Sequence, residues 1–427
     1  MRREIQAAAA DGSPPLDRIS AATMTSGAAS AILPKSETGK DMRILHLSAD
    51  YPDPLQPAKT RAVSNLLALV PEHEHRVISL NRVDWRLGIE ATDFADEAGP
   101  AHRAVAYGAP PKGLFMHRFL MRLADWAAAD CAEAGFRPDL VHAHKLSVEG
   151  LVALELAARW GAPFAVSIQG DSDLAITGVK RGLRPLHARI WKEAAAAFPF
   201  APWARDRLDA RLGRREGRTI LLPCPGPADA VMAPAATPPV IVTAFHFASA
   251  GRKNAAALIR ALARAAEAEP EIRLDVIGGG DPAAFARLSA LARAAAPGRV
   301  RFLGALPHAE VQRRFNAACG FALVSKRESY GMVFAEALLA GAPCLIPRGW
   351  GIDGYLEEGS AVISADSGDE AEIAAGLVRL VREQAALKAR LAEIGAAGGL
   401  ERFRRGAVAA AYREGLEGIS GGKARAA

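Results

Sequence analysis

The stretch FALVSKRESYGMVFAEALLAGAPCLIP, residues Phe321 to Pro347, places a longer amphipathic segment between two short apolar ones. The outer segments, Phe321–Val324 and Cys344–Ile346, have the length and composition of buried strands. Apolar residues recur at helical spacing from Met332 onward, and Gly341 stands where helices commonly end. A strand, a helix and a second strand in this order predict a parallel β-α-β unit.

The same alternation of strands and helices extends in both directions from this stretch. The other strand candidates are Met42–Ser48, Arg76–Leu80, Leu140–Ala143, Phe164–Ile168, Val240–Ala244, Ile272–Ile277 and Val300–Leu303, and helical stretches include Thr60–Val70 and Gly150–Trp160. A proline-rich segment, Leu222–Pro239, interrupts the pattern, and 427 residues exceed the usual size of one domain. We therefore predict two Rossmann-like, doubly wound α/β domains that face a central cleft.

The domain boundaries follow from composition and periodicity. Residues 1–41 are rich in Ala, Ser, Thr and Gly without periodicity, which predicts a disordered extension. Met42 begins the first strand and is also a candidate start codon. We then expect an N-terminal domain at 42–225, a linker at 226–238, a second domain at 239–400, a final helix at 401–420 and a tail at 421–427.

Composition and charge indicate the cellular compartment and the possible partners of the protein. The four cysteines, Cys131, Cys224, Cys319 and Cys344, form no zinc-binding pattern and suggest a reducing compartment. No run reaches the roughly 18 apolar residues of a membrane span, and residues 1–41 lack the apolar core of a secretory signal. We expect a cytoplasmic protein. The net charge of +6 fits nucleotide sugars or an anionic membrane; no nucleic-acid-binding motif accompanies it.

The turn before the Met332 helix has the chemistry of an anion site. Gly331 removes a side chain where a ligand approaches the backbone, and the first N–H groups of a helix are free to bind phosphate. Glu328 precedes this helix and Glu336 lies within it, so both carboxylates can accept hydrogen bonds from sugar or ribose hydroxyls. The alternative is an ordinary pair of surface glutamates.

The segment ESYGMVFAEALLAGAPCLIP resembles the ExGFGxxxxEAxAxGxPV signature of the retaining glycosyltransferases of family 4, and the resemblance extends over about residues 42–420. It implies a GT-B fold, with the E-x7-E pair at Glu328 and Glu336. In that family the first Glu contacts the donor sugar and the second holds the nucleotide ribose. The resemblance also implies that backbone amides of Tyr330, Gly331 and Met332 bind near the β-phosphate and the sugar.

Two segments of the second half resemble other donor-binding motifs of the family. FASAGRKNAAAL, from Phe247, resembles the GRLxxxKG segment whose Arg and Lys neutralise the donor diphosphate. Lys253 matches the Lys, but Ala248 stands at the Arg position and Arg252 is the nearest replacement; a solvated charge at a helix start is the alternative for Arg252. The run GGGD resembles the strand-end GxG of the family, which predicts that Gly279 lines the nucleotide pocket.

The first half carries a weaker set of matches. DLVHAHKLSVEG resembles the DVVHAH strand end, which places His144 beside the donor sugar, while His142 either faces the same side or is a buried structural residue. SIQGDSD resembles the TxHG turn, with Gln169 in place of the His. Lys59 follows a proline-containing first loop and either binds an anion or is an ordinary helix-start lysine.

Two further patterns mimic metal sites. Asp171 and Asp173 form a DxD motif, and Glu72, His73, Glu74 and His75 form a cluster before a strand. The resemblance implies that neither binds a metal and that the nucleotide sugar is the only small molecule needed.

These observations predict a retaining hexosyltransferase of polysaccharide or glycolipid biosynthesis, with Glu328, His144 and Lys253 as its catalytic residues. The alternatives are a GT-B sugar-nucleotide epimerase and a non-catalytic nucleotide-sugar-binding protein, the second because of Ala248 and Gln169. The donor, the acceptor and the linkage are left open.

The segment Lys112–Trp126 alternates basic and large apolar residues, as interfacial helices do. Its apolar face either packs on the sheet or contacts a membrane. A basic run from Lys180 to Arg218 would add attraction to anionic lipid, and lipid-linked acceptors are common in the family. We expect peripheral association with the inner face of the cell membrane.

Overall fold

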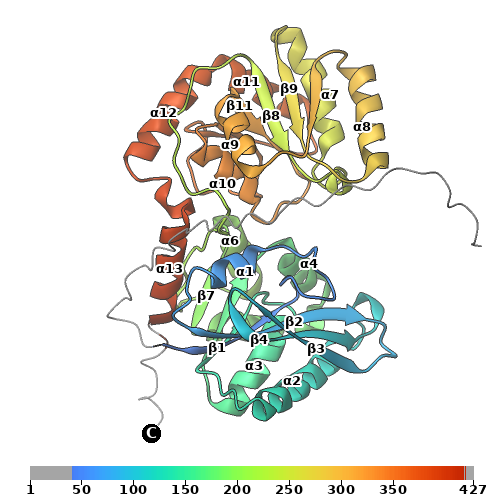
Figure 1. The fold of residues 1–427 in the computed structure, drawn as a ribbon, viewed down its shortest axis with the longest axis vertical. Helices are drawn as coiled ribbons and strands as arrows, with labels where there is room; N and C mark the ends of the chain where they lie inside the picture. The colour runs from blue at the N-terminus through green and yellow to red at the C-terminus, as the bar shows by residue number, and fades with distance from the viewer. Residues whose placement is uncertain (1–40, 418, 420–427) are drawn as a thin grey trace, which may run out of the picture. The chain divides into compact units, whose positions relative to one another are not determined.

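The computed structural model describes residues 41–417 and 419 (Figure 1). The extension predicted for residues 1–41, apart from Asp41, and the predicted tail lie outside these residues. The described chain forms two sheets with helices around them, one in each half of the sequence. Within residues 41–417, no helix combines the length and the apolar character that crossing a membrane requires.

The first sheet has seven strands in the order β3-β4-β2-β1-β5-β6-β7, and all pairs are parallel except the antiparallel β3 and β4. Its strands are β1 (Arg43–Ser48), β2 (Glu74–Val83), β3 (Ile89–Asp96), β4 (Gly99–Gly108), β5 (Leu140–Ala143), β6 (Phe164–Ile168) and β7 (Ala196–Pro199). The accompanying helices are α1 (Ala62–Leu67), η1 (Pro111–Gly113), α2 (Met116–Glu133), α3 (Glu149–Trp160), α4 (Asp171–Val179), η2 (Arg181–Leu183), α5 (Arg184–Glu193) and α6 (Pro202–Leu212).

The second sheet has six parallel strands in the order β10-β9-β8-β11-β12-β13. Its strands are β8 (Val240–Ala244), β9 (Arg273–Ile277), β10 (Val300–Gly304), β11 (Gly320–Ala322), β12 (Cys344–Pro347) and β13 (Val362–Ala365). The helices of this half are η3 (Phe247–Ser249), α7 (Ala255–Ala268), α8 (Pro282–Ala295), α9 (His308–Asn316), α10 (Met332–Leu339), α11 (Glu370–Arg382), α12 (Gln384–Ala396), η4 (Glu401–Phe403) and α13 (Arg405–Glu417).

The last helix, α13, returns to the first sheet (red in Figure 1). Successive strand residues face opposite sides of a sheet, so Leu45 packs in the core with α2 and α3, whereas Ile44 packs in a second core with Tyr412 of α13. Residues far apart in sequence therefore share one face of the first sheet. That face also carries the polar residue His142, whose Nδ1 lies 2.8 Å from the Tyr412 hydroxyl oxygen.

The predicted strands are present, but β3, β4, β7 and β13 were missed. β3 (IEATDFAD) is exposed along most of its length, so it lacks the apolar run of a buried strand. β7 (AAFP) and β13 (VISA) are four residues long, too short for periodicity to identify. The expected strand at Phe321–Val324 begins one residue earlier and ends at Ala322.

The loops after β6 and β11 contact each other. A Cβ atom on Gly170 would lie 2.2 Å from Ser329 Oγ, and Asp171 Oδ2 is 3.3 Å from Arg327 Nε. Residues 222–238, which join the two sheets, contain no helix or strand. These contacts bring the carboxyl ends of two strands, one from each sheet, next to each other.

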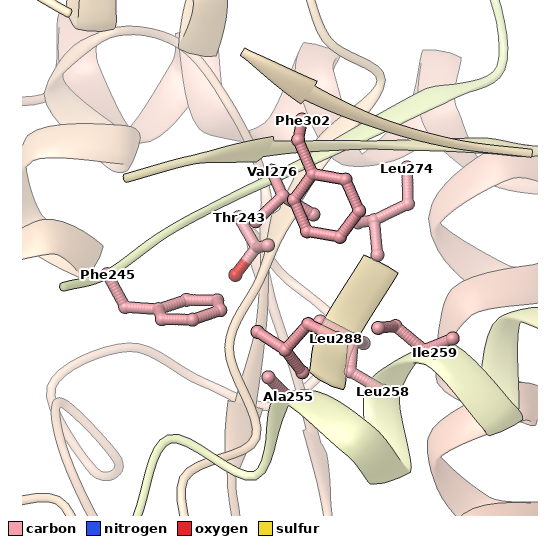
Figure 2. Close-up of a pocket in the computed structure, with 9 residues that line it drawn as sticks. All are labelled: Thr243, Phe245, Ala255, Leu258, Ile259, Leu274, Val276, Leu288 and Phe302. Carbon is pink, nitrogen blue, oxygen red and sulfur yellow. The ribbon is translucent and has the colours of Figure 1, made fainter. Parts of the chain in front are cut away.

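A small cavity of about 10 Å³ lies in the core of the second half, lined by residues of β8, β9, β10, α7 and α8 (Figure 2). The Thr243 hydroxyl group lies among the apolar side chains of this space; it is buried and has no hydrogen-bond partner among residues 41–417. A water molecule needs at least two polar partners in such a cavity, and Thr243 is the one polar residue of the lining. The hydroxyl group is therefore desolvated without compensation.

We expect Thr243→Val to raise the free energy of unfolding by about 1 kcal/mol, because it replaces an unsatisfied buried hydroxyl by a methyl of similar shape. Thr177→Val is the matched control. The Thr177 hydroxyl is also buried but donates to Asp173 O at 2.7 Å, so its loss should lower stability by about 1 kcal/mol. Urea titrations of both variants measure the difference; destabilisation by Thr243→Val would contradict the assignment.

Candidate functional site

The segment between β11 and α10 forms the centre of the site. Gly331 immediately precedes α10 and has φ +71°, a value that L-residues with a Cβ rarely adopt. A Cβ at this position would lie 2.7 Å from the Phe334 ring and 3.0 Å from Glu328 Cγ. Glycine thus lets the chain turn into α10, where Phe334 N donates to Gly331 O at 2.9 Å and the N–H groups of Met332 and Val333 donate to no described residue.

Glu328 is a buried carboxylate between two cations. Its Oε2 accepts hydrogen bonds from Lys253 Nζ at 2.5 Å and from Ser325 Oγ at 2.8 Å, and its Oε1 lies 3.6 Å from Arg252 Nη1. Glu328 is only 5% exposed, whereas the Arg252 side chain is 52% exposed. One negative and two positive groups leave a local charge of +1 beside the start of α10.

One backbone hydrogen bond joins the two loops that carry these groups, and another joins the Glu328 loop to the loop after β12. Lys326 N donates to Arg252 O at 3.0 Å, and Gly351 N donates to Glu328 O at 2.9 Å. Ala248, at the position where the family has an Arg, is exposed and carries no charge. Arg252 is therefore the partly exposed guanidinium that the structure brings next to Glu328 and Lys253.

Glu336 lies on α10 in a mostly buried position. Its Oε2 is 3.7 Å from His308 Nε2 at the start of α9, and a Cβ on Gly226 would lie 3.2 Å from its Oε1. Burial raises the pKa of Glu336, while the nearby His308 acts in the opposite direction. The structure thus adds His308 to the surroundings of the predicted ribose-binding carboxylate.

Tyr330 and Met332 flank Gly331 in different environments. The Tyr330 ring is buried against Phe200 and Tyr355, and its hydroxyl group has no hydrogen-bond partner in the described part of the chain. Met332 is half-buried. Only the backbone amides of these residues were predicted to bind the donor, and this prediction is compatible with the burial of the Tyr330 side chain.

Gly279 lies in the loop after β9, beside the loops that follow β8 and β10. Its carbonyl accepts a hydrogen bond from Phe247 N at 3.0 Å, and its own Cβ would lie 3.2 Å from the Ala305 Cβ. At Gly280, with φ +73°, a Cβ would collide with the exposed His246 imidazole at 2.3 Å. The glycine run allows three loops at the carboxyl ends of the strands to pack closely.

His144 follows β5, as predicted, but its ring faces the protein interior. It is 1% exposed, with Nε2 3.1 Å from His46 Nδ1 and Nδ1 3.1 Å from Gln169 Nε2. His142 is also buried, with Nε2 2.9 Å from Ser167 Oγ. Neither ring nitrogen of His144 is free, so its predicted contact with a donor sugar stays a prediction. Gln169 is more exposed than His144.

Lys59 has a structural position instead of an anion-binding one. Its Nζ donates to Asp53 Oδ2 at 2.8 Å and to Ser79 Oγ at 3.0 Å, and its side chain is 9% exposed. These hydrogen bonds connect the first loop to β2. Of the two alternatives for Lys59, the structure favours the one without a ligand.

The residues of the two metal-like patterns are paired with other groups. Asp173 is buried and accepts from Ser147, and Asp171 pairs with Arg327. Glu72 pairs with Arg413, and Glu74 pairs with Arg43. A set that the sequence did not suggest places ring nitrogens of His46, His142 and His144 within 4.8 Å of one another, a spacing compatible with metal ligands.

Ser325, His308 and the Asp171–Arg327 pair were not predicted as site residues. Ser325 lies in the polar turn that follows β11, three residues before Glu328, so its closeness in sequence could have suggested the contact. His308 comes from α9, and no local pattern connects it with Glu336.

Two protein families match successive parts of the chain. The model of the Glycosyl transferase 4-like domain matches residues 57–225, and that of Glycosyl transferases group 1 matches residues 234–397. The first match covers most of the seven-stranded sheet and the second covers the six-stranded sheet. Together with this architecture, the matches indicate a glycosyltransferase of the GT-B fold, and the predicted fold class is confirmed.

Individual relatives agree with this class. Glycogen synthase from Mycobacterium tuberculosis is 24% identical over 373 residues, which cover 82% of this chain and 88% of the relative. Sucrose-phosphate synthase from Thermosynechococcus elongatus has a TM-score of 0.63 at 18% identity, covering 87% of this chain and 98% of its own. Anabaena HepE in complex with UDP has a TM-score of 0.63 at 16% identity, with 88% and 99% coverage. These two structures show likeness of fold.

We expect Gly331→Ala to destabilise the protein by about 2 to 4 kcal/mol, because the left-handed backbone costs roughly 1–2 kcal/mol for Ala and the new methyl group overlaps the Phe334 ring. Gly298→Ala is the matched control. Gly298 has φ +72°, but no atom of the described residues lies within 4 Å of its Cβ position. Its substitution should therefore cost only the free energy of the left-handed backbone. Equal losses in urea titrations would show that the space beside Gly331 does not matter.

Proposed function

We propose that this glycosyltransferase retains the anomeric configuration, and that it transfers a hexose from a nucleoside diphosphate sugar to an acceptor hydroxyl group in polysaccharide or glycolipid synthesis. The observation that carries the proposal is the Glu328 carboxylate between Lys253 and Arg252 at the start of α10. The excess positive charge and the N–H groups of Met332 and Val333 at the start of the helix suit a diphosphate.

We propose that the nucleotide binds along α10, next to the diphosphate. Glu336 would accept hydrogen bonds from the ribose hydroxyl groups, with His308 3.7 Å away to favour its ionised form. Two solved structures of similar fold, both of Anabaena HepE, contain UDP or UDP-glucose. This supports a nucleoside diphosphate sugar as the donor class, without selecting the base or the sugar.

The reaction requires compensation of the charge that develops on the departing diphosphate. Lys253 and Arg252 are held in place before the donor binds, so little reorganisation is needed when the bond breaks. Glu328 keeps Lys253 ordered and would contact the donor sugar. The acceptor hydroxyl group attacks the face from which the diphosphate leaves, and a phosphate oxygen takes its proton. In this mechanism the protein's own cations act without a metal ion.

A non-catalytic nucleotide-sugar-binding protein is the second candidate, favoured by the uncharged Ala248 at the family's Arg position. An epimerase would change the donor sugar without an acceptor. We would screen UDP-, GDP- and ADP-sugars by thermal shift, because a ligand at 100 times its Kd stabilises by about 2.7 kcal/mol. Product analysis with and without acceptors then separates transfer, epimerisation and binding alone.

With the donor identified, we expect Lys253→Ala to lower kcat by on the order of 10², because a preorganised charge on the leaving group is lost. Arg264→Ala, an exposed cation of the same loop and helix segment, is the control and should retain activity. Normal turnover of Lys253→Ala would transfer the role to Arg252.

The acceptor side carries an exposed apolar patch at the start of α2 and the end of α4. Leu114, Phe115 and Val179 are 57%, 68% and 76% exposed, and Lys180 Nζ joins the two segments through Gly113 O at 2.9 Å. The body of α2 packs on the sheet through residues such as Leu120, whereas Leu114 and Phe115, just before the helix, are exposed.

The basic surroundings of this patch favour anionic lipid as its partner. Lys112, Arg118 and Arg181 are exposed close to it in sequence, and each basic residue near a membrane contributes about 1 kcal/mol. The run from Lys180 to Arg218 is not one basic surface: Arg215 is buried on backbone carbonyl groups, and Arg207 stacks on Trp350 at 4.5 Å. We propose peripheral membrane association through the patch.

We expect the double variant Leu114→Ser/Phe115→Ser to bind anionic vesicles more than tenfold more weakly, because each buried apolar side chain contributes roughly 1.5–3 kcal/mol. Leu55→Ser, an exposed apolar residue of the first loop, is the control. Co-sedimentation at rising salt measures the electrostatic part. Absence of vesicle binding by the unmodified protein, or binding insensitive to salt, would contradict the membrane proposal.

A further inference from the structure

Residues 84–88 form a tight turn directly after β2, and two large apolar side chains of this turn are exposed. Trp85 is 50% exposed and Leu87 is 54% exposed. Leu87 N donates to Asp84 O at 3.0 Å, and Arg86 N donates to Asp84 Oδ1 at 3.0 Å, so hydrogen bonds close the turn. Arg86 Cζ lies 5.6 Å from the centre of the Trp85 ring. We call residues 84–88 the Trp85 turn.

The end of β4 holds the Trp85 turn in place. Gly108 N donates to Gly88 O at 3.0 Å, and Ala109 N donates to Val83 O at 3.3 Å. A Cβ atom on Gly108 would lie 2.0 Å from Leu87 O, so the backbone of the turn packs directly on this glycine. An aromatic side chain on a backbone that is already ordered loses little conformational freedom when a ligand binds. The Trp85 turn therefore presents a preorganised apolar surface.

The strand order places the Trp85 turn on the same edge of the first sheet as the loop that adjoins the donor site. β2, β1, β5 and β6 are parallel neighbours, so the turns that follow them lie at one edge. The loop after β6 contacts Ser329, next to Glu328, through Gly170. β1 and β5 separate β2 from β6, so these two turns are three strand spacings apart, about 14 Å. That distance exceeds the length of one sugar ring but suits a short chain of sugars.

Polar groups that can bind hydroxyl groups accompany the Trp85 turn. Tyr107 of β4 is paired with Arg82 of β2 in the strand register. The Tyr107 hydroxyl group forms no hydrogen bond with the described residues and is not among their fully enclosed atoms. Burial raises the pKa of Tyr107 to about 12, so this group stays protonated and can both donate and accept. Arg82 is exposed and adds further N–H donors.

The loops between the Trp85 turn and the donor site carry charges that compensate each other. Lys145 Nζ, after β5, lies 2.6 Å from Asp50 Oδ2, after β1, and the two side chains are 16% and 34% exposed. Such a pair keeps donors and acceptors for hydroxyl groups. Covering it with the acyl chains of a lipid would cost free energy, because the charges would lose their remaining contact with water. The chemistry of this edge therefore suits a sugar chain better than a membrane.

On the basis of the proposed function, we propose that the acceptor is an oligosaccharide chain, and that Trp85 stacks on one of its sugar rings at a distance from the residue that receives the hexose. The C–H groups on the face of a sugar ring match the negative face of an aromatic ring. Tyr107 and Arg82 bind hydroxyl groups of the same sugar. The Lys145–Asp50 pair binds a sugar nearer to the donor. A single sugar beside the donor does not reach Trp85, so affinity rises with the length of the acceptor.

An array of immobilised saccharides, from single sugars to chains of six residues, tests the proposal with the full chain and a nucleoside diphosphate present. We expect the unmodified protein to bind at least one chain of three or more residues, and to bind the matching single sugar at least tenfold more weakly. Trp85→Ala should bind that chain about tenfold more weakly, because the stacking contact is lost. Trp85→Phe keeps an aromatic face and should retain most of the affinity.

Phe285→Leu, which removes an exposed aromatic ring from α8 in the other half of the chain, is the matched control and should leave the array unchanged. Thermal shift should show the same affinity for the nucleoside diphosphate in every variant. The proposal is wrong if no chain binds, if single sugars bind as tightly as chains, or if Trp85→Ala loses binding to anionic vesicles instead of saccharides. Absence of nucleotide binding by the unmodified protein contradicts the proposed function, which the array does not test.

Discussion

A buried carboxylate must be compensated, and in this protein the compensation of Glu328 organises the loops of the second sheet. An unpaired charge inside a protein costs several kcal/mol, so Glu328 is stable in its position only with Lys253 2.5 Å away and Ser325 2.8 Å away. Lys253 comes from the loop after β8 and Glu328 from the loop after β11, which are neighbouring strands. The ion pair therefore joins two loops at one edge of the sheet, and the Lys326–Arg252 backbone hydrogen bond reinforces the connection. Because one carboxylate faces two cations, the site is structurally complete yet keeps a positive charge for a ligand.

In the first sheet, the groups that must be compensated are polar rings, which lie on the side that α13 covers. His46, His142 and His144 are at most 1% exposed, and each ring nitrogen has a hydrogen-bond partner. Tyr412 supplies one of those partners from α13, almost at the end of the chain. Buried polar groups are stable only when they are satisfied, so the C-terminal helix does more than add apolar contacts. Its return places the Tyr412 hydroxyl on His142, whose ring stacks on that of His144 with 4.2 Å between the centroids.

The sequence predicted the fold well where strands are buried on both faces, because such strands are continuous apolar runs between turn residues. It failed at β3, whose exposed residues give no apolar run, and at the short strands β7 and β13. Glu328, Gly331 and Lys253 were predicted as donor-site residues mainly by resemblance, but the contact between Lys253 and Glu328 follows from strand order, which local patterns do not encode. Lys59 shows the same limit. A helix-start lysine looks available for an anion until the fold brings Asp53 and Ser79 within 3.0 Å of its Nζ. His144 was placed correctly after β5, but its inward orientation depends on His46 and Gln169, which lie far away in the sequence.

The departures of this chain from its family's motifs occur on both sides of the contact between the two sheets. On one side, Ala248 removes a guanidinium, and Arg252 places one 3.6 Å from Glu328. On the other side, Gln169 replaces a histidine, yet it still hydrogen-bonds to the imidazole of His144. Each substitution keeps a chemical group near its expected place while changing the residue that supplies it. A decayed site would lose such groups without replacement, because nothing would select a guanidinium beside Glu328 or an N–H donor for His144. The paired changes therefore favour the proposed transferase over a non-catalytic remnant.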